Sequence, residues 1–224
     1  MIRLGEKQTL TVVKKVDFGV YLAEEGKPEK RVLLPAKQVP EGTELADEVA
    51  VFLYKDSKDR MIATIHEPKL KMGDVAPLTV VSVQQIGAVL DWGLEKDLFL
   101  PYKEQIGKVQ TGDTVLVRLY IDKSSRLCAS MKELYDMLDT DSPYQRGDVV
   151  QGRVYEFSNN FGAFVAVDDR YSALIPHHED HSFLRIGQQI EARVAGVKPD
   201  GKIDLTLRDK AYVQIDKDAQ QVME

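Results

Sequence analysis

The chain has 224 residues, of which 43% are hydrophobic and 29% are charged, and its formal net charge is −6. These proportions are ordinary for a folded, soluble protein and give no sign of disorder. No apolar run approaches the roughly 18 residues that cross a bilayer, and the N-terminal residues lack an apolar stretch of signal-peptide length. The single cysteine, Cys128, excludes an internal disulfide. We therefore expect a cytoplasmic protein with no membrane partner.

The acidic balance also bears on nucleic acid as a partner. Proteins that bind DNA or RNA often carry a basic surplus, and this chain has none. If the protein binds nucleic acid, it must do so through a local basic patch, and the affinity must depend more on base stacking than on electrostatic attraction by the whole chain.

One sequence pattern occurs three times along the chain. Each copy begins with an apolar strand, continues with an aromatic or aliphatic residue before a glycine, and reaches a Leu-Pro or Ile-Pro step. The glycines at 19, 87 and 162 are 68 and 75 residues apart, and the prolines at 35, 101 and 176 are 66 and 75 apart. Because two independent markers keep nearly the same spacing, the copies are repeats of one structural unit.

Each copy predicts about five short strands. In chain order they lie at 9–13, 18–22, near 34, 49–53 and 61–63; at 78–81, 86–89, near 100, 115–119 and 127–129; and at 150–154, 161–165, near 175, 190–194 and 203–205. Short, regularly spaced strands with period-two alternation favour a sandwich or barrel. A closed barrel also removes free strand edges in a unit this small. We predict an all-β fold of three tandem five-stranded OB-type barrels, at 1–67, 72–131 and 145–210.

The connections between the copies are short. Residues 66–73 join the first two units, and neither connection is rich in glycine or serine, so limited freedom between units is expected. Residues 131–138 carry apolar side chains at helical spacing and predict a short helix, which the segment 139–143 would end.

The third copy carries the residues that resemble a known family. Its motifs are Gly152-Arg153-Val154, Phe161-Gly162-Ala163-Phe164-Val165, Ala173-Leu174-Ile175 and Gly187. They closely resemble those of the S1 RNA-binding domain, and this resemblance implies the S1-type OB barrel. The first copy is a good second match through Phe18-Gly19-Val20-Tyr21. The second copy is recognisable mainly by its register and its turn at 122–126, and is degenerate.

With a Leu-Pro or Ile-Pro step in every unit, residues 1–210 are similar to the bacterial conserved virulence factor B family. That resemblance implies S1 barrels followed by a C-terminal winged helix. Residues 211–224 are too short for such a domain, so we expect a tail at the start of an absent or truncated winged helix.

The predicted RNA site begins with paired aromatic rings. Residues i and i+3 of a regular strand face opposite sides, but a glycine bulge would return Phe161 and Phe164, or Phe18 and Tyr21, to one face. Adjacent exposed rings form a platform on which each stacked base contributes about 1–3 kcal/mol, whatever its identity. The resemblance implies the same stacking pair. The alternative is that one or both rings are buried, because aromatic side chains dominate protein cores.

The second copy has aliphatic residues, Ile86 and Val89, at the two ring positions. We expect it to have lost base stacking and to serve as a spacer or docking surface.

Basic residues in the turn before the last strand are the predicted phosphate contacts. Arg60 and Arg126 each follow an aspartate by four residues, as in the S1 pattern, whereas the third copy has Lys198 and Lys202. The alternative is an ordinary charged turn exposed to solvent. S1 domains often carry a histidine where this chain has proline, and His177, beside Pro176, is a candidate substitute, although a polar loop is the commoner meaning of such a residue.

These observations predict a non-enzymatic regulator of gene expression that binds single-stranded RNA with low sequence specificity, with single-stranded DNA as a second candidate ligand. The candidate binding residues are Phe161, Phe164, Lys202, Lys198, His177, Phe18, Tyr21, Arg60 and Arg126. No nucleotide-binding or hydrolase motif is present, so no cofactor is expected, and the histidine-rich loop 177–181 is interpreted as solvated rather than as a metal site. The alternative function is a protein-protein docking scaffold, because OB barrels also bind proteins.

Overall fold

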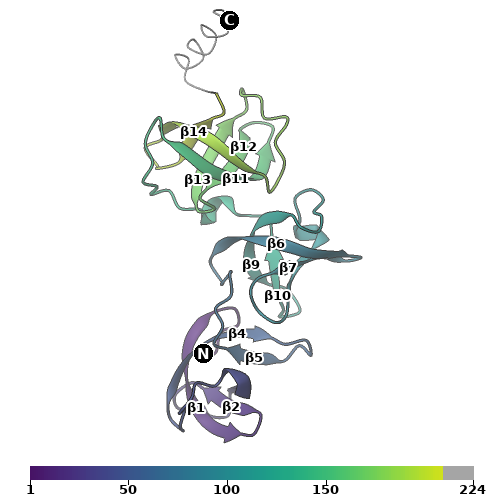
Figure 1. Cartoon of the computed structure of the whole chain (residues 1–224), viewed down its shortest axis with the longest axis vertical. Helices are drawn as coiled ribbons and strands as arrows, with labels where there is room; N and C mark the ends of the chain where they lie inside the picture. The colour runs from purple at the N-terminus through teal and green to yellow at the C-terminus, as the bar shows by residue number, and fades with distance from the viewer. Residues whose placement is uncertain (209–224) are drawn as a thin grey trace, which may run out of the picture. The chain divides into compact units, whose positions relative to one another are not determined.

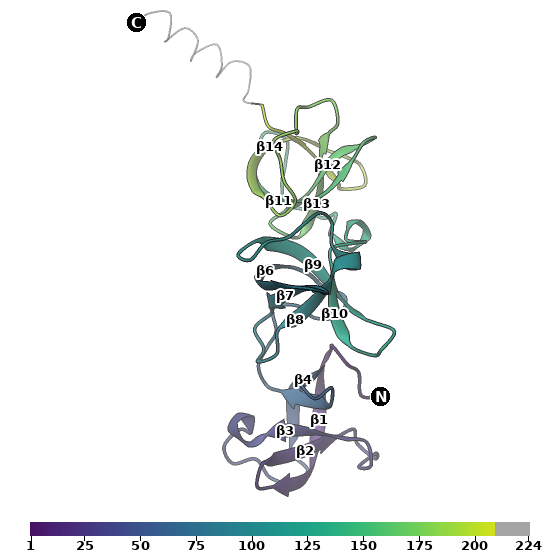
Figure 2. The same cartoon turned by 90° about the vertical axis from the view of Figure 1, so that its right-hand side faces the viewer.

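The computed structural model describes residues 1–208, so the tail predicted at 211–224 lies outside the described residues. Within that range the chain forms three closed five-stranded barrels, which confirms the predicted fold class (Figures 1 and 2). Barrels one and two lie in one compact unit, Met1–Leu134, and a second unit that begins at Tyr135 contains barrel three.

The same strand order is repeated in each barrel, with the third strand pairing in parallel with the fifth. Barrel one contains β1 (Lys7–Val16), β2 (Gly19–Ala23), β3 (Arg31–Pro35), β4 (Glu48–Lys55) and β5 (Met61–Thr64). Barrel two contains β6 (Val75–Gln84), β7 (Gly87–Asp91), β8 (Leu98–Pro101), β9 (Thr114–Ile121) and β10 (Leu127–Ser130). Barrel three contains β11 (Val149–Ser158), β12 (Gly162–Val167), β13 (Tyr171–Pro176), β14 (Gln189–Val197) and β15 (Ile203–Thr206).

Alternating burial along the strands produces the cores. In barrel three, Val165 of β12 and Ile175 of β13 are fully buried, while their neighbours Phe164 and Leu174 are only half-buried. The inward set is almost entirely Val, Ile, Leu and Ala. Because successive side chains of a strand point to opposite faces, the residues between the core positions form the outer surface.

The repeated glycine and proline are cross-strand partners where the second strand begins and the third strand ends. A Cβ built on the glycine would lie 2.1–2.4 Å from the carbonyl oxygen of the residue before the proline in every barrel. Only glycine permits so close an approach of two backbones. This contact explains why both markers keep the same spacing: the pairs are Gly19 with Pro35, Gly87 with Pro101 and Gly162 with Pro176.

The bulge that the sequence predicted at the glycine is in a different strand. In barrel three the register shifts between Val154 and Glu156 of β11, where Tyr155 is the extra residue. Barrels one and two have the same shift in β1 and β6. Phe161 lies in the turn before β12, and Gly162, at φ +123°, redirects the chain. The two rings therefore reach one face through the turn and the glycine conformation.

The helix predicted across residues 131–138 is wrong. The only helical turn there is the 3-10 turn η3 (Tyr135–Met137), which precedes barrel three. Turns of the same length, η1 (Ala36–Gln38) and η2 (Tyr102–Glu104), follow the third strand in barrels one and two. Glu133 has φ +59°, a left-handed conformation that interrupts a right-handed helix. Met131 and Leu134 are nevertheless buried, so the apolar spacing indicated burial rather than a helix. None of the helical segments in residues 1–208 has the length and apolar character needed to traverse a bilayer.

Barrels one and two are joined within their unit by buried and polar contacts. Trp92 is 2% exposed and packs edge-on against Phe52 and Tyr54, with ring centroids 5.8 and 6.5 Å away. The Lys96 ammonium donates to the carbonyl oxygen of Asp56 at 3.0 Å. These contacts give the two small barrels a shared apolar surface, which supports units that would be marginal alone.

Candidate nucleic-acid interface

Two aromatic rings face outward side by side on barrel three. Phe161 is 60% exposed, Phe164 is half-buried, and their centroids lie 6.3 Å apart at an interplanar angle of 55°. Neither belongs to the apolar core of the barrel. The alternative that these rings fill the core is therefore excluded by their position.

Local hydrogen bonds hold the more exposed ring in place. The hydroxyl oxygen of Ser158 accepts the backbone N–H groups of Asn160 and Phe161, both at 3.3 Å. The N–H of His177 donates to the Phe161 carbonyl at 2.8 Å. The turn between β11 and β12 is thus tied both to itself and to the end of β13, so the platform needs little ordering when a ligand arrives.

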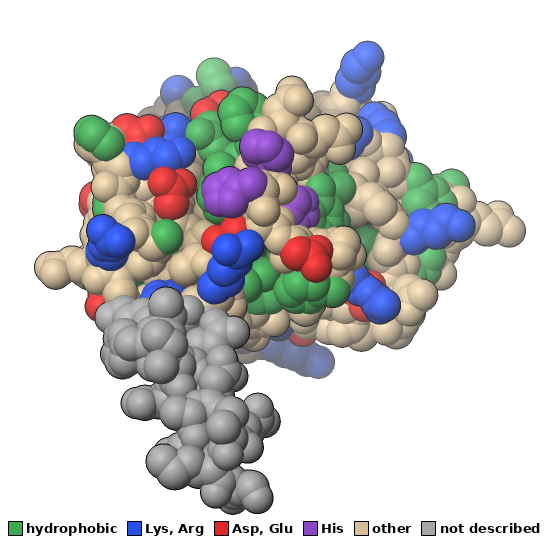
Figure 3. All heavy atoms as spheres, turned by 90° about the horizontal axis from the view of Figure 1, so that it is seen from above, with side chains coloured by type: hydrophobic (Ala, Val, Ile, Leu, Met, Phe, Trp, Pro, Cys, Tyr) green, Lys and Arg blue, Asp and Glu red, His purple; other side chains and the backbone are tan. Residues whose placement is uncertain are grey.

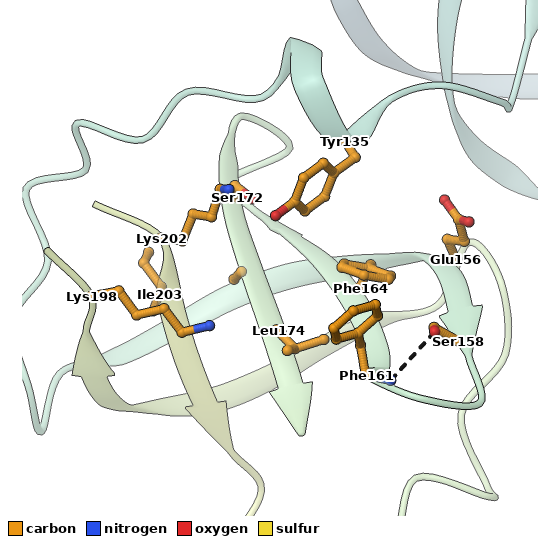
Figure 4. Close-up of a pocket in the computed structure, with 11 residues that line it drawn as sticks. Tyr135, Glu156, Ser158, Phe161, Phe164, Ser172, Leu174, Lys198, Lys202 and Ile203 are labelled. Carbon is orange, nitrogen blue, oxygen red and sulfur yellow. Dashed lines mark hydrogen bonds between the residues drawn. The ribbon is translucent and has the colours of Figure 1, made fainter. Parts of the chain in front are cut away.

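The rings form one wall of a pocket of about 480 Å³. Figure 4 shows Leu174 of β13 on the floor, the rings on one side, and Lys198 and Lys202 on the opposite side. Glu156 stands at the rim behind the rings, away from the lysines (Figure 4). An apolar slot with cations on one side matches a flat base attached to a phosphate.

The lysines lie in the turn between β14 and β15. The N–H of Lys198 donates to the carbonyl of Lys202 at 2.9 Å, as Asp56 does to Arg60 and Asp122 does to Arg126 in the other barrels. The aspartate that the third copy lacks is replaced by Asp200, whose carboxylate accepts the N–H of Lys202 at 3.1 Å.

Each lysine ammonium is only weakly paired. Lys198 lies 3.5 Å from Asp204, and Lys202 lies 3.5 Å from Asp200. Ion pairs between exposed side chains contribute about 0–1 kcal/mol, so a phosphate can displace either carboxylate.

A third aromatic ring, which the sequence analysis missed, borders the pocket. Tyr135 is the first residue of η3, and its ring meets Phe164 edge-on at a centroid distance of 5.4 Å and an angle of 76°. The Lys202 nitrogen lies 4.7 Å from the centre of the Tyr135 ring. A hydrogen bond with Tyr135 is the main cause that raises the pKa of Lys202 above its usual value. The only sequence signal was an aromatic residue shortly before the third copy.

Barrel one has a similar pair of rings. Phe18 is 58% exposed and meets the half-buried Tyr21 edge-on, with centroids 6.3 Å apart. Arg31, which the sequence analysis also missed, lies over the Tyr21 ring at 4.7 Å. Its guanidinium adds a cation and a flat surface beside the platform.

Arg60 is turned back onto its own turn. Two of its guanidinium N–H groups donate to one carboxylate oxygen of Asp56, at 2.8 and 3.0 Å. Desolvation alone would raise the pKa of Asp56, but hydrogen bonds from the Arg60 backbone and side chain outweigh it and hold that pKa below its usual value. A phosphate must compete with this carboxylate for Arg60.

Barrel two has a different surface at the equivalent position. Ile86 is 69% exposed and Val89 is half-buried, while the aromatic side chain comes from β8: the Phe99 ring lies against Gly87. Arg126 donates to the Asp59 carboxylate of the barrel-one turn at 3.2 Å. Within this unit Arg126 therefore contributes to the junction between the barrels.

The histidine-rich loop follows β13. His177 is exposed and meets His178 edge-on at 6.1 Å, and His181 stacks on Phe157 at 6.1 Å and 16°. Among residues 1–208, no group of three or more His, Cys, Asp or Glu side chains converges on a point where a metal could bind. Figure 3 shows histidines gathered beside hydrophobic side chains, with charges of both signs interspersed over that face.

Barrel three is a closed five-stranded barrel with one outward ring just before its second strand and another on that strand, and with cations in its last turn. These features define an S1-type OB barrel. The model of the S1 domain matches residues 4–66 and 72–132, and the model of the second domain of virulence regulatory factor CvfB matches residues 137–209. The chain belongs to the CvfB family of S1-domain proteins, which confirms the resemblance noted from its sequence. The S1 model thus matches the first two barrels, whereas the sequence analysis ranked the third as nearest to S1.

The chain is similar to several known proteins along most of its length. The chain is 29% identical to the uncharacterized protein YitL of Bacillus subtilis, over 99% of this chain and 76% of that protein. It is 23% identical to conserved virulence factor B of Staphylococcus haemolyticus, over 81% of this chain, and it spans 63% of that relative's length. A solved multidomain protein with nucleic acid binding domains from Streptococcus pneumoniae shares the fold, with a TM-score of 0.64, 19% identity and coverage of 98% of this chain and 81% of that one.

Proposed function

We propose that the chain binds single-stranded RNA by base stacking on barrel three, assisted by barrel one, and thereby regulates gene expression in the cytoplasm. The observation that carries this proposal is the pair of outward rings, Phe161 and Phe164, facing two lysines across an apolar pocket. Support also comes from the relatives, which include proteins named conserved virulence factor B and a protein described as having nucleic acid binding domains.

Stacking supplies most of the affinity in this proposal. Each stacked base contributes about 1–3 kcal/mol and any base can stack, so sequence preference is low. Lys198 and Lys202 add phosphate contacts, while the net charge of −6 provides no general attraction. For a single strand, neutralising two phosphates predicts a slope of log affinity against log salt of about −1.4.

The direct test is fluorescence anisotropy with labelled oligouridine and oligothymidine at two salt concentrations. F161A/F164A should weaken binding at least tenfold, because about 1–3 kcal/mol per stacked base is removed. Phe183→Ala is a matched control, since Phe183 is as exposed as Phe161, at 60%, and does not line the pocket. Unchanged affinity in F161A/F164A would remove barrel three from the RNA site.

A second function, docking of a protein, is favoured by the surface of barrel two. Val81, Val83 and Ile86 are 44%, 42% and 69% exposed, so the barrel presents an aliphatic side chain, Ile86, at the position where the other barrels present a ring, and two exposed valines on β6. An apolar protein interface would respond weakly to salt, whereas RNA affinity falls as salt rises. The same titrations at two salt concentrations therefore separate the two functions.

A further inference from the structure

We propose that Tyr135 and Lys202 together read the edge of a base bound in the barrel-three pocket and favour keto bases, uracil and guanine, over the amino bases cytosine and adenine. This inference rests on the proposed function and adds to it a modest base preference. It is carried by the arrangement of hydrogen-bond donors at the lysine side of the pocket.

The first step concerns the shape of the pocket. Tyr135 meets Phe164 at 76°, and Phe164 meets Phe161 at 55°, so the three rings form a concave wall rather than a flat platform. Phe161 is the most exposed of the three and offers its face to a base. A base stacked there directs one edge across the Leu174 floor, toward the side where Tyr135 and Lys202 converge (Figure 4).

The second step concerns which hydrogen atoms face that edge. The Lys202 nitrogen lies 4.7 Å from the centre of the Tyr135 ring, and because a lysine ammonium can only donate, it faces the Tyr135 hydroxyl as a donor to the oxygen. The hydroxyl hydrogen of Tyr135 must then point elsewhere, and in Figure 4 the hydroxyl end of the ring is directed into the pocket. Lys202 keeps further N–H groups beside it. Both groups therefore present donors to a ligand.

The third step matches these donors to a base. Uracil and guanine carry a carbonyl oxygen where cytosine and adenine carry an amino group. A carbonyl oxygen can accept a hydrogen bond from Tyr135 or Lys202, whereas an amino group at that position would place one hydrogen-bond donor against another. Two other charged groups line the pocket. Lys198 is a further donor on the lysine side, and Glu156 stands at the opposite rim, so neither reverses this preference (Figure 4).

The experiment compares bases of equal size. Oligouridine is paired with oligocytidine, and oligoinosine with oligoadenosine, so that each pair exchanges a carbonyl oxygen for an amino group, and the adjoining ring N–H for a bare ring nitrogen, at one edge. We expect the native chain to bind the keto member about three- to tenfold more tightly, which corresponds to one net hydrogen bond. Y135F keeps the ring and the Lys202 donor, so it should lower both ratios toward one while leaving oligocytidine affinity unchanged. Y135A removes a wall and should weaken binding of every oligomer.

Tyr102→Phe is the matched control, because Tyr102 also begins a 3-10 turn and is on barrel two. If the native chain binds none of the oligomers, the proposed function itself fails. If it binds with equal affinity to keto and amino bases, or if Y135F keeps the native ratio, the inference is overturned while RNA binding stands. Tighter binding by Y135A would also overturn it, because Tyr135 would then obstruct the pocket.

Discussion

Replacing Gly162 by alanine tests whether the repeated glycine places the aromatic pair. The new Cβ would lie 2.1 Å from the Ile175 carbonyl oxygen and 2.6 Å from the His177 nitrogen, at φ +123°. A side chain in a glycine-only conformation costs about 1–3 kcal/mol. Relieving the collision must also separate β12 from the end of β13, which breaks the hydrogen bond from His177 to Phe161 and costs about 1 kcal/mol more.

The free energy of unfolding should therefore fall by about 2–4 kcal/mol. This loss is large for one barrel, because a stability of about 0.05–0.15 kcal/mol per residue gives a unit of roughly 70 residues only about 4–10 kcal/mol in total. Urea unfolding followed by far-UV circular dichroism should show the barrel-three transition at lower urea. Trp92 is the only tryptophan and lies in the other unit, so its fluorescence transition should not move.

Gly196→Ala provides the control within the same barrel. Gly196 lies in β14, its Cβ would meet no atom within 4 Å, and its φ is not positive. Its substitution should change stability by less than about 0.5 kcal/mol. If G162A and G196A unfold at the same urea concentration, the close approach of the strands does not constrain this barrel.

Two further predictions concern barrel two. Ile86→Phe places a ring on an exposed position near the half-buried Phe99. The variant should bind oligouridine at least fivefold more tightly, as measured by fluorescence anisotropy, because a further base can stack on the new ring. No gain in affinity would show that the barrel-two surface lies outside the path of the RNA. Burial raises the pKa of the Cys128 thiol from 9.0 to about 11, so the native thiol should react slowly with Ellman's reagent at pH 8 and rapidly in urea. Since the unfolded thiol ionises first, stability should fall between pH 9 and 11, and C128A should lessen that slope; an unchanged slope would mean that other groups cause it.

The barrels could be predicted from the sequence because their markers have a geometric cause. Gly162 and Pro176 are partners across two strands, and no other residue tolerates the contact that glycine makes there. Strand alternation then decided which residues enter the core. The location of the bulge could not be predicted, because residues 154–156, where the register of β11 shifts, include no glycine or proline.

The candidate site was predicted only in part. Phe161 and Phe164 belong to a local motif, so their shared face could be inferred from the glycine between them. Tyr135 reaches the same pocket from a turn before the barrel, and Arg31 reaches Tyr21 from the neighbouring strand. Such contacts depend on the folded positions of separate segments. Local periodicity therefore gives no signal for them, and at 131–138 it predicted a helix.

On the proposed RNA-binding function, the charges beside the rings would set the order in which barrels one and three engage RNA. Arg60 is held by Asp56 through two short hydrogen bonds, whereas Lys198 and Lys202 have carboxylate partners only at 3.5 Å. A phosphate therefore loses less to competing carboxylates at barrel three than at barrel one. Because every one of these cations already faces an acidic group, adding phosphate exchanges one partner for another and gains little net energy. The affinity of this acidic chain should consequently follow the number of exposed rings more closely than the number of cations.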